Sequence, residues 1–304
     1  MSVQEKALAS QRAKGIVLVL IAAIFWGISG TVAQYLFQEQ GFQADWLVVV
    51  RLLASGIILL TLAQTVRKQT IWSVWRVKQD AIQLLLFGLV GMLGVQYTYF
   101  AAIQHGNAAT ATILQYLAPV LITCFVCLRY QKLPTKYELA SIVLALAGTF
   151  LLVTGGRINS LSITKAAFFW GIASAFSLAF YTLQPGNLLK KWGSFLTVGW
   201  GMIIGGIALN FITPVWKFQG QWSFSSFIAV LFVIVFGTLI AFYCYLESLN
   251  YISAAETSLL GSAEPLSAAF LAVIWLQVPF GLPEWIGTIS ILSTIFILST
   301  VKNK

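Results

Sequence analysis

The sequence predicts an all-α integral membrane protein whose ten transmembrane helices form two inverted repeats of five helices each. Three observations support this prediction: the composition, the number of long apolar segments, and a pattern of residues that occurs twice. Of the 304 residues, 59% are hydrophobic and only 9% are charged, whereas soluble domains average about 25% charged residues. With a mean hydropathy of +0.87, most of the chain must be hidden from water, and we expect a lipid bilayer to hide it.

Ten apolar segments are long enough to cross a hydrocarbon core of about 30 Å. Short connections, often marked by Gly, Pro or Asn, separate them, and none alternates like a strand of a transmembrane barrel. The expected spans are residues 15–37, 45–64, 79–103, 107–130, 135–155, 164–186, 194–214, 225–250, 253–276 and 283–301. The first span is too long for the apolar region of a signal peptide, so we expect a retained helix.

Basic residues in the connections predict the orientation. If the N-terminus is cytoplasmic, fourteen Lys and Arg residues outside the spans lie on the cytoplasmic side and only Arg157, Lys165 and Lys217 on the outer side. This bias follows the positive-inside rule, so we expect a multi-pass protein of the bacterial cytoplasmic membrane with both termini in the cytoplasm. The net charge of +9 is thereby explained by topology, and we expect no nucleic-acid partner.

A shift of 146 residues places similar residues of the two halves on one another. Each half, residues 1–155 and 156–304, holds five expected helices, and because five is odd the second copy enters the membrane in the opposite direction. Inverted repeats are typical of secondary transporters, whose substrate site lies near the midplane between the repeats. The matched pairs include Tyr97 with Tyr243, Tyr99 with Tyr245, and Pro119 with Pro265.

Four motifs give the chain a family resemblance over nearly its whole length. They are Ala22-Ala-Ile-Phe-Trp-Gly27, Arg51-Leu-Leu-Ala54, Gly106-Asn-Ala-Ala-Thr-Ala-Thr-Ile-Leu-Gln-Tyr-Leu-Ala-Pro119 and Ile252-Ser-Ala-Ala-Glu-Thr-Ser-Leu-Leu-Gly-Ser-Ala-Glu-Pro265. With them the chain resembles the EamA-type members of the drug/metabolite transporter superfamily. The resemblance implies a ten-helix fold of two inverted repeats and the transport of small metabolites, often as export.

Glu264 places a carboxylate deep in the ninth expected helix. It lies eleven residues beyond Ser253, the expected cap of that helix, which at 1.5 Å per residue is about 16 Å, near the midplane. Charge at the bilayer centre costs roughly 2.5–3.5 kcal/mol on insertion scales. Two interpretations stay open: Glu264 binds a substrate amine, a cation or a proton, or it is a structural carboxyl bonded to a neighbouring helix. Glu256, in contrast, fits a capping box with Ser253.

Further candidates for substrate binding are polar or aromatic residues within the spans. Arg51 lies two turns into the second helix, where it binds a substrate carboxylate, snorkels outward or pairs with an acidic residue. Aromatic faces attract ammonium groups, although packing and lipid contact explain most aromatic residues in membranes. The aromatic and amide candidates are Trp26, Tyr97, Tyr99, Gln115, Tyr181, Tyr243 and Tyr245, and the expected bending points are Pro119 and Pro265.

These features predict an alternating-access secondary transporter for a small polar metabolite, with amino acids or related compounds as the first choice. Export and proton coupling are candidate properties. One alternative is the transport of quaternary amines or cationic drugs through an aromatic-lined pocket, and another is a membrane sensor or structural protein. An enzyme is not expected, since the chain has a single His and no HExxH motif. No P-loop, metal site or cofactor site is predicted, and monomer and dimer stay open.

Overall fold

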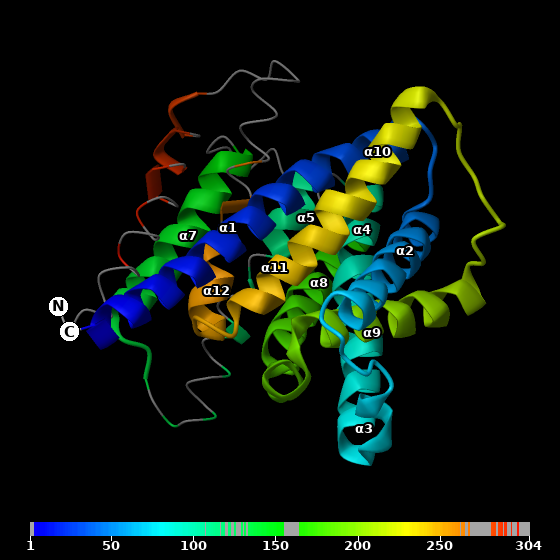
Figure 1. Cartoon of the computed structure of the whole chain (residues 1–304). Helices are drawn as coiled ribbons and strands as arrows, with labels where there is room; N and C mark the ends of the chain where they lie inside the picture. Colours follow the sequence, from blue (N-terminus) through cyan, green and yellow to red (C-terminus); the bar gives the residue numbers. More distant parts are fainter. Residues whose placement is uncertain are drawn as a thin grey trace.

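The computed structural model describes most of the chain as a bundle of helices (Figure 1). The described residues are 3–106, 108–115, 117–118, 121–122, 125, 129, 131, 133–154, 164–261, 263–264, 267, 281–283, 285–287, 289–290, 293 and 297. Within these ranges all regular elements are helical and no β-strand occurs. The all-α fold predicted from the sequence is therefore confirmed.

The helices of the two halves follow one another in the same order. The first half contains α1 (Val3–Gln38), α2 (Ala44–Thr65), the 3₁₀ turn η1 (Ser73–Arg76), α3 (Lys78–Leu86), the π-helical segment η2 (Phe87–Leu93), α4 (Gly94–His105), α5 (Ala108–Gln115) and α7 (Lys136–Thr154). The second half contains α8 (Lys165–Leu183), α9 (Gly186–Ile212), α10 (Phe224–Ile234), the π-helical segment η4 (Val235–Ile240), α11 (Ala241–Ser248) and α12 (Ala254–Leu260).

Six helical segments in the described part of the chain are long and apolar enough to cross a membrane. They are Ser10–Gln38, Ala44–Thr65, Lys78–His105, Lys165–Leu183, Gly186–Ile212 and Phe224–Ser248. Each coincides with one expected span. The expected span 135–155 contains α7, which has a shorter apolar stretch at Leu139–Gly148. The expected spans 107–130, 253–276 and 283–301 lie partly or largely outside the described residues.

A glycine divides α9 into a short leading helix and a longer apolar one. Gly193 has φ 77° and ψ 166°, a conformation that side chains with a Cβ rarely adopt. The leading helix carries Lys191, whose Nζ lies 2.5 Å from Oδ2 of Asp80 on α3. The apolar part begins at Ser194, where the sequence predicts a span over residues 194–214.

The two halves pack on each other reciprocally. Helix α1 lies against α10 and α11 of the second half, α8 lies against η2 and α4 of the first half, and α2 packs on α9 (Figure 1). Segments η2 and η4 interrupt equivalent helices, since Phe87 and Val235 are 148 positions apart. Single-turn π segments are rare and occur frequently at functional sites. Helices from each half thus contact helices of the other half, and the division into two repeats stays a prediction.

The sequence Gly201-Met-Ile-Ile-Gly205 on α9, in which two glycines are separated by three residues, lies inside this arrangement. A Cβ at Gly201 would lie 2.5 Å from Cε1 of Phe87, and a Cβ at Gly205 would lie 3.0 Å from the carbonyl oxygen of Gly88. Small residues let helix backbones approach closely in membranes. The motif therefore joins α9 to η2 within one chain.

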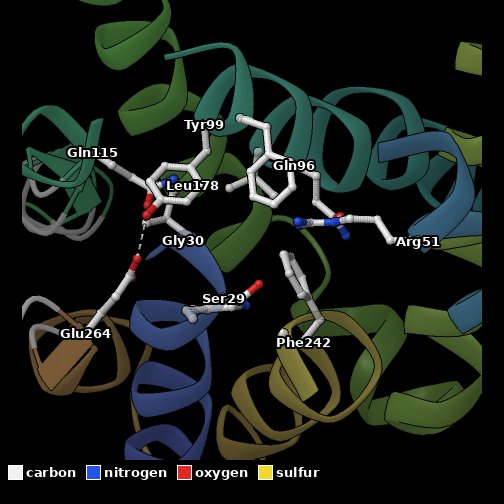
Figure 2. A pocket seen from close by; sticks show the side chains of 13 residues that line it. Ser29, Gly30, Arg51, Gln96, Tyr99, Gln115, Leu178, Phe242 and Glu264 are labelled. Atoms are coloured by element: carbon white, nitrogen blue, oxygen red, sulfur yellow. Dashed lines mark hydrogen bonds between the residues drawn. The ribbon is translucent and has the colours of Figure 1, made fainter. Parts of the chain in front are cut away.

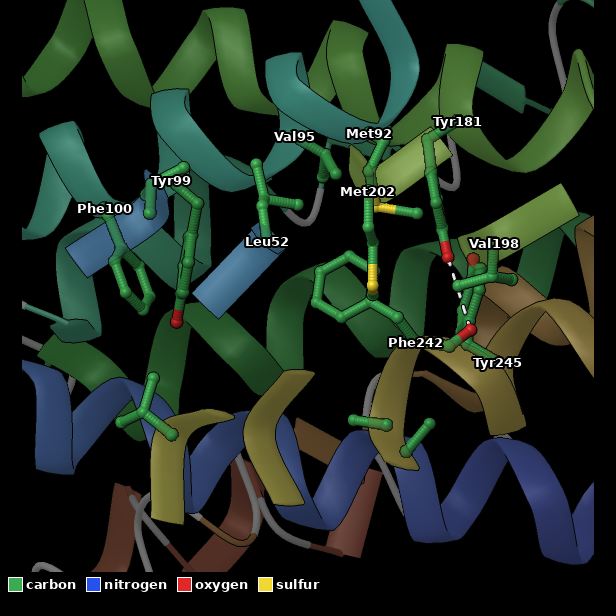
Figure 3. Packing of buried hydrophobic residues seen from close by; sticks show 14 of the residues in the cluster. Leu52, Met92, Val95, Tyr99, Phe100, Tyr181, Val198, Met202, Phe242 and Tyr245 are labelled. Carbon is green, nitrogen blue, oxygen red and sulfur yellow. Dashed lines mark hydrogen bonds between the residues drawn. The ribbon is translucent and has the colours of Figure 1, made fainter. Parts of the chain in front are cut away.

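An aromatic cluster fills the centre of the bundle beside these contacts (Figure 3). Tyr181 on α8 stacks on Tyr245 with ring centroids 5.9 Å apart and meets Phe242 edge to face at 5.6 Å. The hydroxyl of Tyr245 is 2.9 Å from Oγ1 of Thr182, so its buried polar end has a partner. The cluster ties α8 to α11, and Phe87 of η2 stacks on Tyr181 with ring centroids 5.6 Å apart.

Candidate substrate site

One cavity is lined by side chains from both halves of the chain (Figure 2). Its walls come from α1, α2, α4, α5, α8, η4 and α11, together with Glu264 beyond α12. The lining residues are Trp26, Ser29, Gly30, Arg51, Val95, Gln96, Tyr99, Phe100, Gln115, Leu178, Gly237, Phe242 and Glu264. Five predicted substrate-binding residues are among them: Trp26, Arg51, Tyr99, Gln115 and Glu264.

The cavity is small in this conformation. Its volume is about 30 Å³, and since one ordered water needs about 10–15 Å³ by this measure, it holds about two or three water molecules. A metabolite of several non-hydrogen atoms fits only after the walls move apart. In this structure the lining residues therefore enclose only a narrow space.

Arg51 supplies a buried positive charge to the cavity. The residue is 2% exposed, and its Nε donates a hydrogen bond to Oε1 of Gln96. The guanidinium carbon lies 3.9 Å from the centroid of the Phe100 ring, a cation–π geometry. Among the residues that the structure describes, no carboxylate pairs with Arg51. Burying a charge without an opposite partner costs several kcal/mol, so an anionic group in the cavity would be stabilised.

Glu264 supplies the opposite charge. Its side chain is 4% exposed, and its Oε1 accepts a hydrogen bond of 3.2 Å from the hydroxyl of Tyr99. That hydroxyl is also 3.0 Å from Oγ1 of Thr112 on α5. Glu264 thus has a bond to a neighbouring helix and also lines the cavity, and each of the two predicted interpretations has a structural counterpart.

The two charges lie at opposite ends of the cavity (Figure 2). Tyr99 lies on the wall between them. Gln96 and Tyr99 are on one wall, formed by α4, and Ser29 is on the facing wall, formed by α1. A ligand with a cationic and an anionic end would match this distribution of charge.

Four predicted site residues do not line this cavity. Tyr97 packs edge to face on Trp170 at 5.3 Å, and Tyr243 packs on Phe195 at 4.4 Å. Tyr181 and Tyr245 belong to the central aromatic cluster. A substrate role for these four tyrosines stays a prediction, and the predicted bending points Pro119 and Pro265 lie outside the described residues.

Several lining residues were not predicted from the sequence. Gln96 directly precedes Tyr97-x-Tyr99, and Ser29 follows Trp26 by three residues, so proximity to the motifs is the signal that could have found them. A sequence similar to the motif Ala22-Ala-Ile-Phe-Trp-Gly27 occurs at Ala166-Ala-Phe-Phe-Trp-Gly171 on α8. Phe100, Gly237 and Phe242 carry no comparable signal. No cluster of His, Cys, Asp or Glu suited to a metal occurs within the described ranges.

Glu256 lies at the start of α12 and joins that helix to α1. The backbone N–H of Glu256 donates to Oγ of Ser253 at 3.2 Å, so the predicted Ser253 cap is confirmed. The carboxylate accepts from Nη2 of Arg12 at 2.8 Å and from Nε of Arg12 at 3.1 Å. The sequence pattern explained Glu256 by capping alone, because a partner 244 residues away leaves no local signal.

A second polar link joins the N-terminal part of α1 to the C-terminal end of α11. Lys14 donates to the hydroxyl of Tyr251 at 2.8 Å, and that hydroxyl donates to Oε1 of Glu247 at 3.1 Å. Gly15 lets α1 approach the segment that contains Tyr251, since a Cβ at Gly15 would lie 2.9 Å from Cβ of Tyr251. Together the two links close one end of the contact between α1 and the second half.

The sequence model of the EamA-like transporter family matches residues 13–154 and again residues 165–300. The chain belongs to the EamA-like transporter family. It is 42% identical to the uncharacterized inner membrane transporter YicL of Salmonella typhimurium, over 94% of this chain and 95% of that protein. It is 25% identical to the threonine/homoserine exporter RhtA of Escherichia coli, over 86% of this chain and 82% of that protein.

The EamA assignment fixes the general activity. The chain is a multi-pass membrane transporter with a small-molecule substrate in a lipid bilayer, and it is not an enzyme. A crystal structure of a protein with 18% sequence identity superposes with a TM-score of 0.74 and covers 94% of this chain and 96% of the other. At this identity the likeness shows the fold alone.

Proposed function

We propose that this EamA transporter carries small zwitterionic amino acids or closely related compounds by alternating access. One observation carries the proposal: a buried arginine and a buried glutamate lie at opposite ends of one cavity between the two halves. Arg51 binds the substrate carboxylate, and Glu264 binds the substrate ammonium. The relative RhtA, named as a threonine/homoserine exporter, supports amino acids as the class and export as the first direction to test.

The contacts of Arg51 leave it suited to a carboxylate. Its hydrogen bond to Gln96 uses Nε, so the two terminal nitrogens remain for an end-on, bidentate pair with two carboxylate oxygens. The stack on Phe100 holds the guanidinium plane in place. A preformed guanidinium loses little freedom on binding, which favours recognition of a planar anion.

Glu264 and Tyr99 suit the other end of the substrate. The hydroxyl of Tyr99 donates to one carboxylate oxygen of Glu264 and so orients the group. An ammonium group can donate to this carboxylate and lie against the face of the Tyr99 ring. Glu264 is also the proposed carrier of a coupled proton, because an ammonium and a proton would compete for the same oxygens.

Transport requires the cavity to open in turn to each side. We propose that residues 1–155 and 156–304 act as inverted repeats that rock against each other, with Pro119 and Pro265 as bending points. The Arg12–Glu256 pair and the Lys14–Tyr251–Glu247 link tie one end of the repeats together. With the predicted cytoplasmic termini, this closed end faces the cytoplasm.

The alternative class, quaternary amines and cationic drugs, has a specific observation against it. Aromatic rings of Trp26, Phe100 and Phe242 line the cavity, but the Arg51 guanidinium lines the same cavity. A lone cation would meet this positive charge with no anionic group of its own to offset it. We therefore place cationic drugs second.

Exchange by the purified protein in liposomes tests the substrate class. Liposomes loaded with labelled homoserine are diluted into pools of neutral amino acids, of quaternary and primary amines, or of simple carboxylates. The proposal expects rapid loss of label only with the amino-acid pool, and protein-free liposomes give the background. Exchange driven by the amine pool alone would favour the second class instead.

A further inference from the structure

We propose that Ser29 and Trp26 form a third polar subsite of the cavity, which binds a hydroxyl on the substrate side chain and selects hydroxylated over aliphatic amino acids. This inference rests on the proposed function, in which Arg51 and Glu264 hold the charged groups of the substrate. It adds a specificity-determining contact on the wall formed by α1.

The hydroxyl of Ser29 is buried without a hydrogen bond. The residue is 2% exposed, and its Oγ has no partner among the residues that the structure describes. Serine and threonine hydroxyls within helices usually bond back to a carbonyl one turn earlier. Thr31 on the same helix does so with Gly27 at 3.2 Å, and Thr112 on α5 does so with Ala108 at 2.7 Å. Ser29 departs from this pattern.

The geometry around Ser29 shows where its hydroxyl points. A Cβ built on Gly237 would lie 2.1 Å from Oγ of Ser29, so the hydroxyl points across to η4 and not back along α1. Both residues line the cavity. The missing side chain at Gly237 thus makes room for a hydroxyl that is free to bond with a ligand.

Trp26 adds a donor on the same face of α1. It precedes Ser29 by three residues, and residues at this spacing are neighbours on a helix surface. Its Nε1 is buried and has no partner in the described part of the chain, whereas Nε1 of Trp46 and of Trp200 each donate to a backbone carbonyl at 2.8 Å. The ring is held against Phe242 and Tyr245, with both centroid distances 4.9 Å.

The chemistry of the two groups defines the ligand atom. An indole N–H only donates, while a serine hydroxyl donates or accepts. A substrate hydroxyl satisfies both, because it can accept from Trp26 and donate to Ser29. A methyl group in the same place satisfies neither and leaves both buried groups unpaired, which is the situation that gives strong discrimination against an analogue lacking the polar group.

The position of Ser29 also fits the side chain of a bound amino acid. Ser29 lies on the wall that faces Gln96 and Tyr99, between the Glu264 end and the Arg51 end (Figure 2). With the ammonium and the carboxylate held at the two ends, the side chain of one enantiomer projects toward α1. The space is limited there, since a Cβ on Gly30 would lie 2.9 Å from the hydroxyl of Tyr99. We infer that serine, threonine and homoserine are the substrates of matching size.

Threonine and valine provide the direct test, because they have the same shape and differ by one hydroxyl. Each unlabelled amino acid competes with labelled homoserine for exchange in liposomes. For the wild type we expect threonine to compete at a concentration at least about 10-fold lower than valine. In Ser29→Ala, the ratio should fall to about 3 or less because threonine weakens and valine does not.

Ser174→Ala is the matched control. Ser174 is a fully buried serine on α8 that bonds to the carbonyl of Gly171 at 2.9 Å and does not line the cavity. Its removal should leave the threonine-to-valine ratio at the wild-type value. Trp26→Phe, which keeps an aromatic ring but removes the N–H donor and one ring of the indole, should lower the ratio as Ser29→Ala does.

The outcomes separate the subsite from the proposed function. If the wild type exchanges amino acids but does not distinguish threonine from valine, the subsite is wrong and the charge-based site stands. This comparison needs no variant, so it holds even if Ser29→Ala fails to fold. An unchanged ratio in a folded Ser29→Ala also overturns the subsite. If no amino acid exchanges at all, the proposed function fails and the subsite fails with it.

Discussion

Replacing Arg51 with glutamine should weaken amino-acid binding without loss of stability. The substitution removes a charge that is 2% exposed and has no carboxylate partner among the described residues, while glutamine can still donate to Gln96. Loss of the stack on Phe100 lowers the folding stability by about 0.5–2 kcal/mol. Removing the unpaired buried charge raises it by several kcal/mol. We therefore expect a thermal midpoint equal to or above that of the wild type.

The same substitution should cost binding in proportion to one charged, bidentate contact. Hydrogen bonds to charged groups contribute about 1.5–3 kcal/mol, which corresponds to a rise of roughly 10-fold to 150-fold in the half-saturating concentration. The loss should depend on the substrate carboxylate. Homoserine should therefore lose affinity in Arg51→Gln, while its carboxamide, which lacks the negative charge, should compete equally weakly with both proteins.

The assay is competition against labelled homoserine exchange in liposomes, paired with thermal unfolding of the same detergent-solubilised samples. Arg12→Gln is the control for removal of an arginine, because Arg12 pairs with Glu256 at 2.8 Å and lies outside the cavity lining. Its thermal midpoint should fall, opposite in sign to that of Arg51→Gln. The reasoning is refuted if Arg51→Gln weakens homoserine and its carboxamide by the same factor, or if homoserine affinity is unchanged.

Three further predictions follow from described contacts. Glu264→Gln should abolish exchange of amino acids that have a free ammonium group at every pH, which a pH series in liposomes measures; wild-type exchange at every pH would show Glu264 to be structural. Exchanging the partners, as Arg12→Glu with Glu256→Arg, should recover part of the thermal stability lost in each single variant, and no recovery would mean that the ion pair contributes nothing. Gly237→Ala should lower stability by about 1–3 kcal/mol and slow exchange, because its Cβ would overlap Oγ of Ser29. Wild-type stability and exchange in this variant would show that the cavity wall shifts to accommodate the added methyl group.

The helices could be predicted from the sequence because hydropathy and length are local properties. The six membrane-crossing segments coincide with expected spans, and the apolar part of α9 starts after Gly193 as predicted. The π-helical segments η2 and η4 were not predicted. They are wider helical turns within continuous apolar runs, so composition does not reveal them.

The site could be predicted only in part because lining a cavity depends on the rotation of each helix. Tyr97 and Tyr99 are two residues apart, which at 3.6 residues per turn places them about 200° apart around the axis. Only one of them can face a given cavity, and the structure turns Tyr99 inward and Tyr97 toward Trp170. Trp26, Arg51 and Glu264 were found because polar or motif residues in an apolar span are conspicuous.

Partners distant in the sequence were outside the reach of pattern analysis. Tyr99 and Glu264 are 165 residues apart, and Arg12 and Glu256 are 244 residues apart. Each contact depends on the reciprocal packing of the two halves. The sequence therefore identified which charges are unusual, and the structure showed which neighbours hold them.

The most direct test of the central claim uses the wild-type protein and three competitors. Labelled homoserine exchange in liposomes is measured against three unlabelled competitors. Homoserine has both charges, its carboxamide has the positive charge alone, and its N-acetyl derivative has the negative charge alone. The proposed site predicts strong competition by homoserine and a loss of at least about 10-fold for each blocked compound. If either blocked compound competes as well as homoserine, the cavity does not recognise a zwitterion through Arg51 and Glu264.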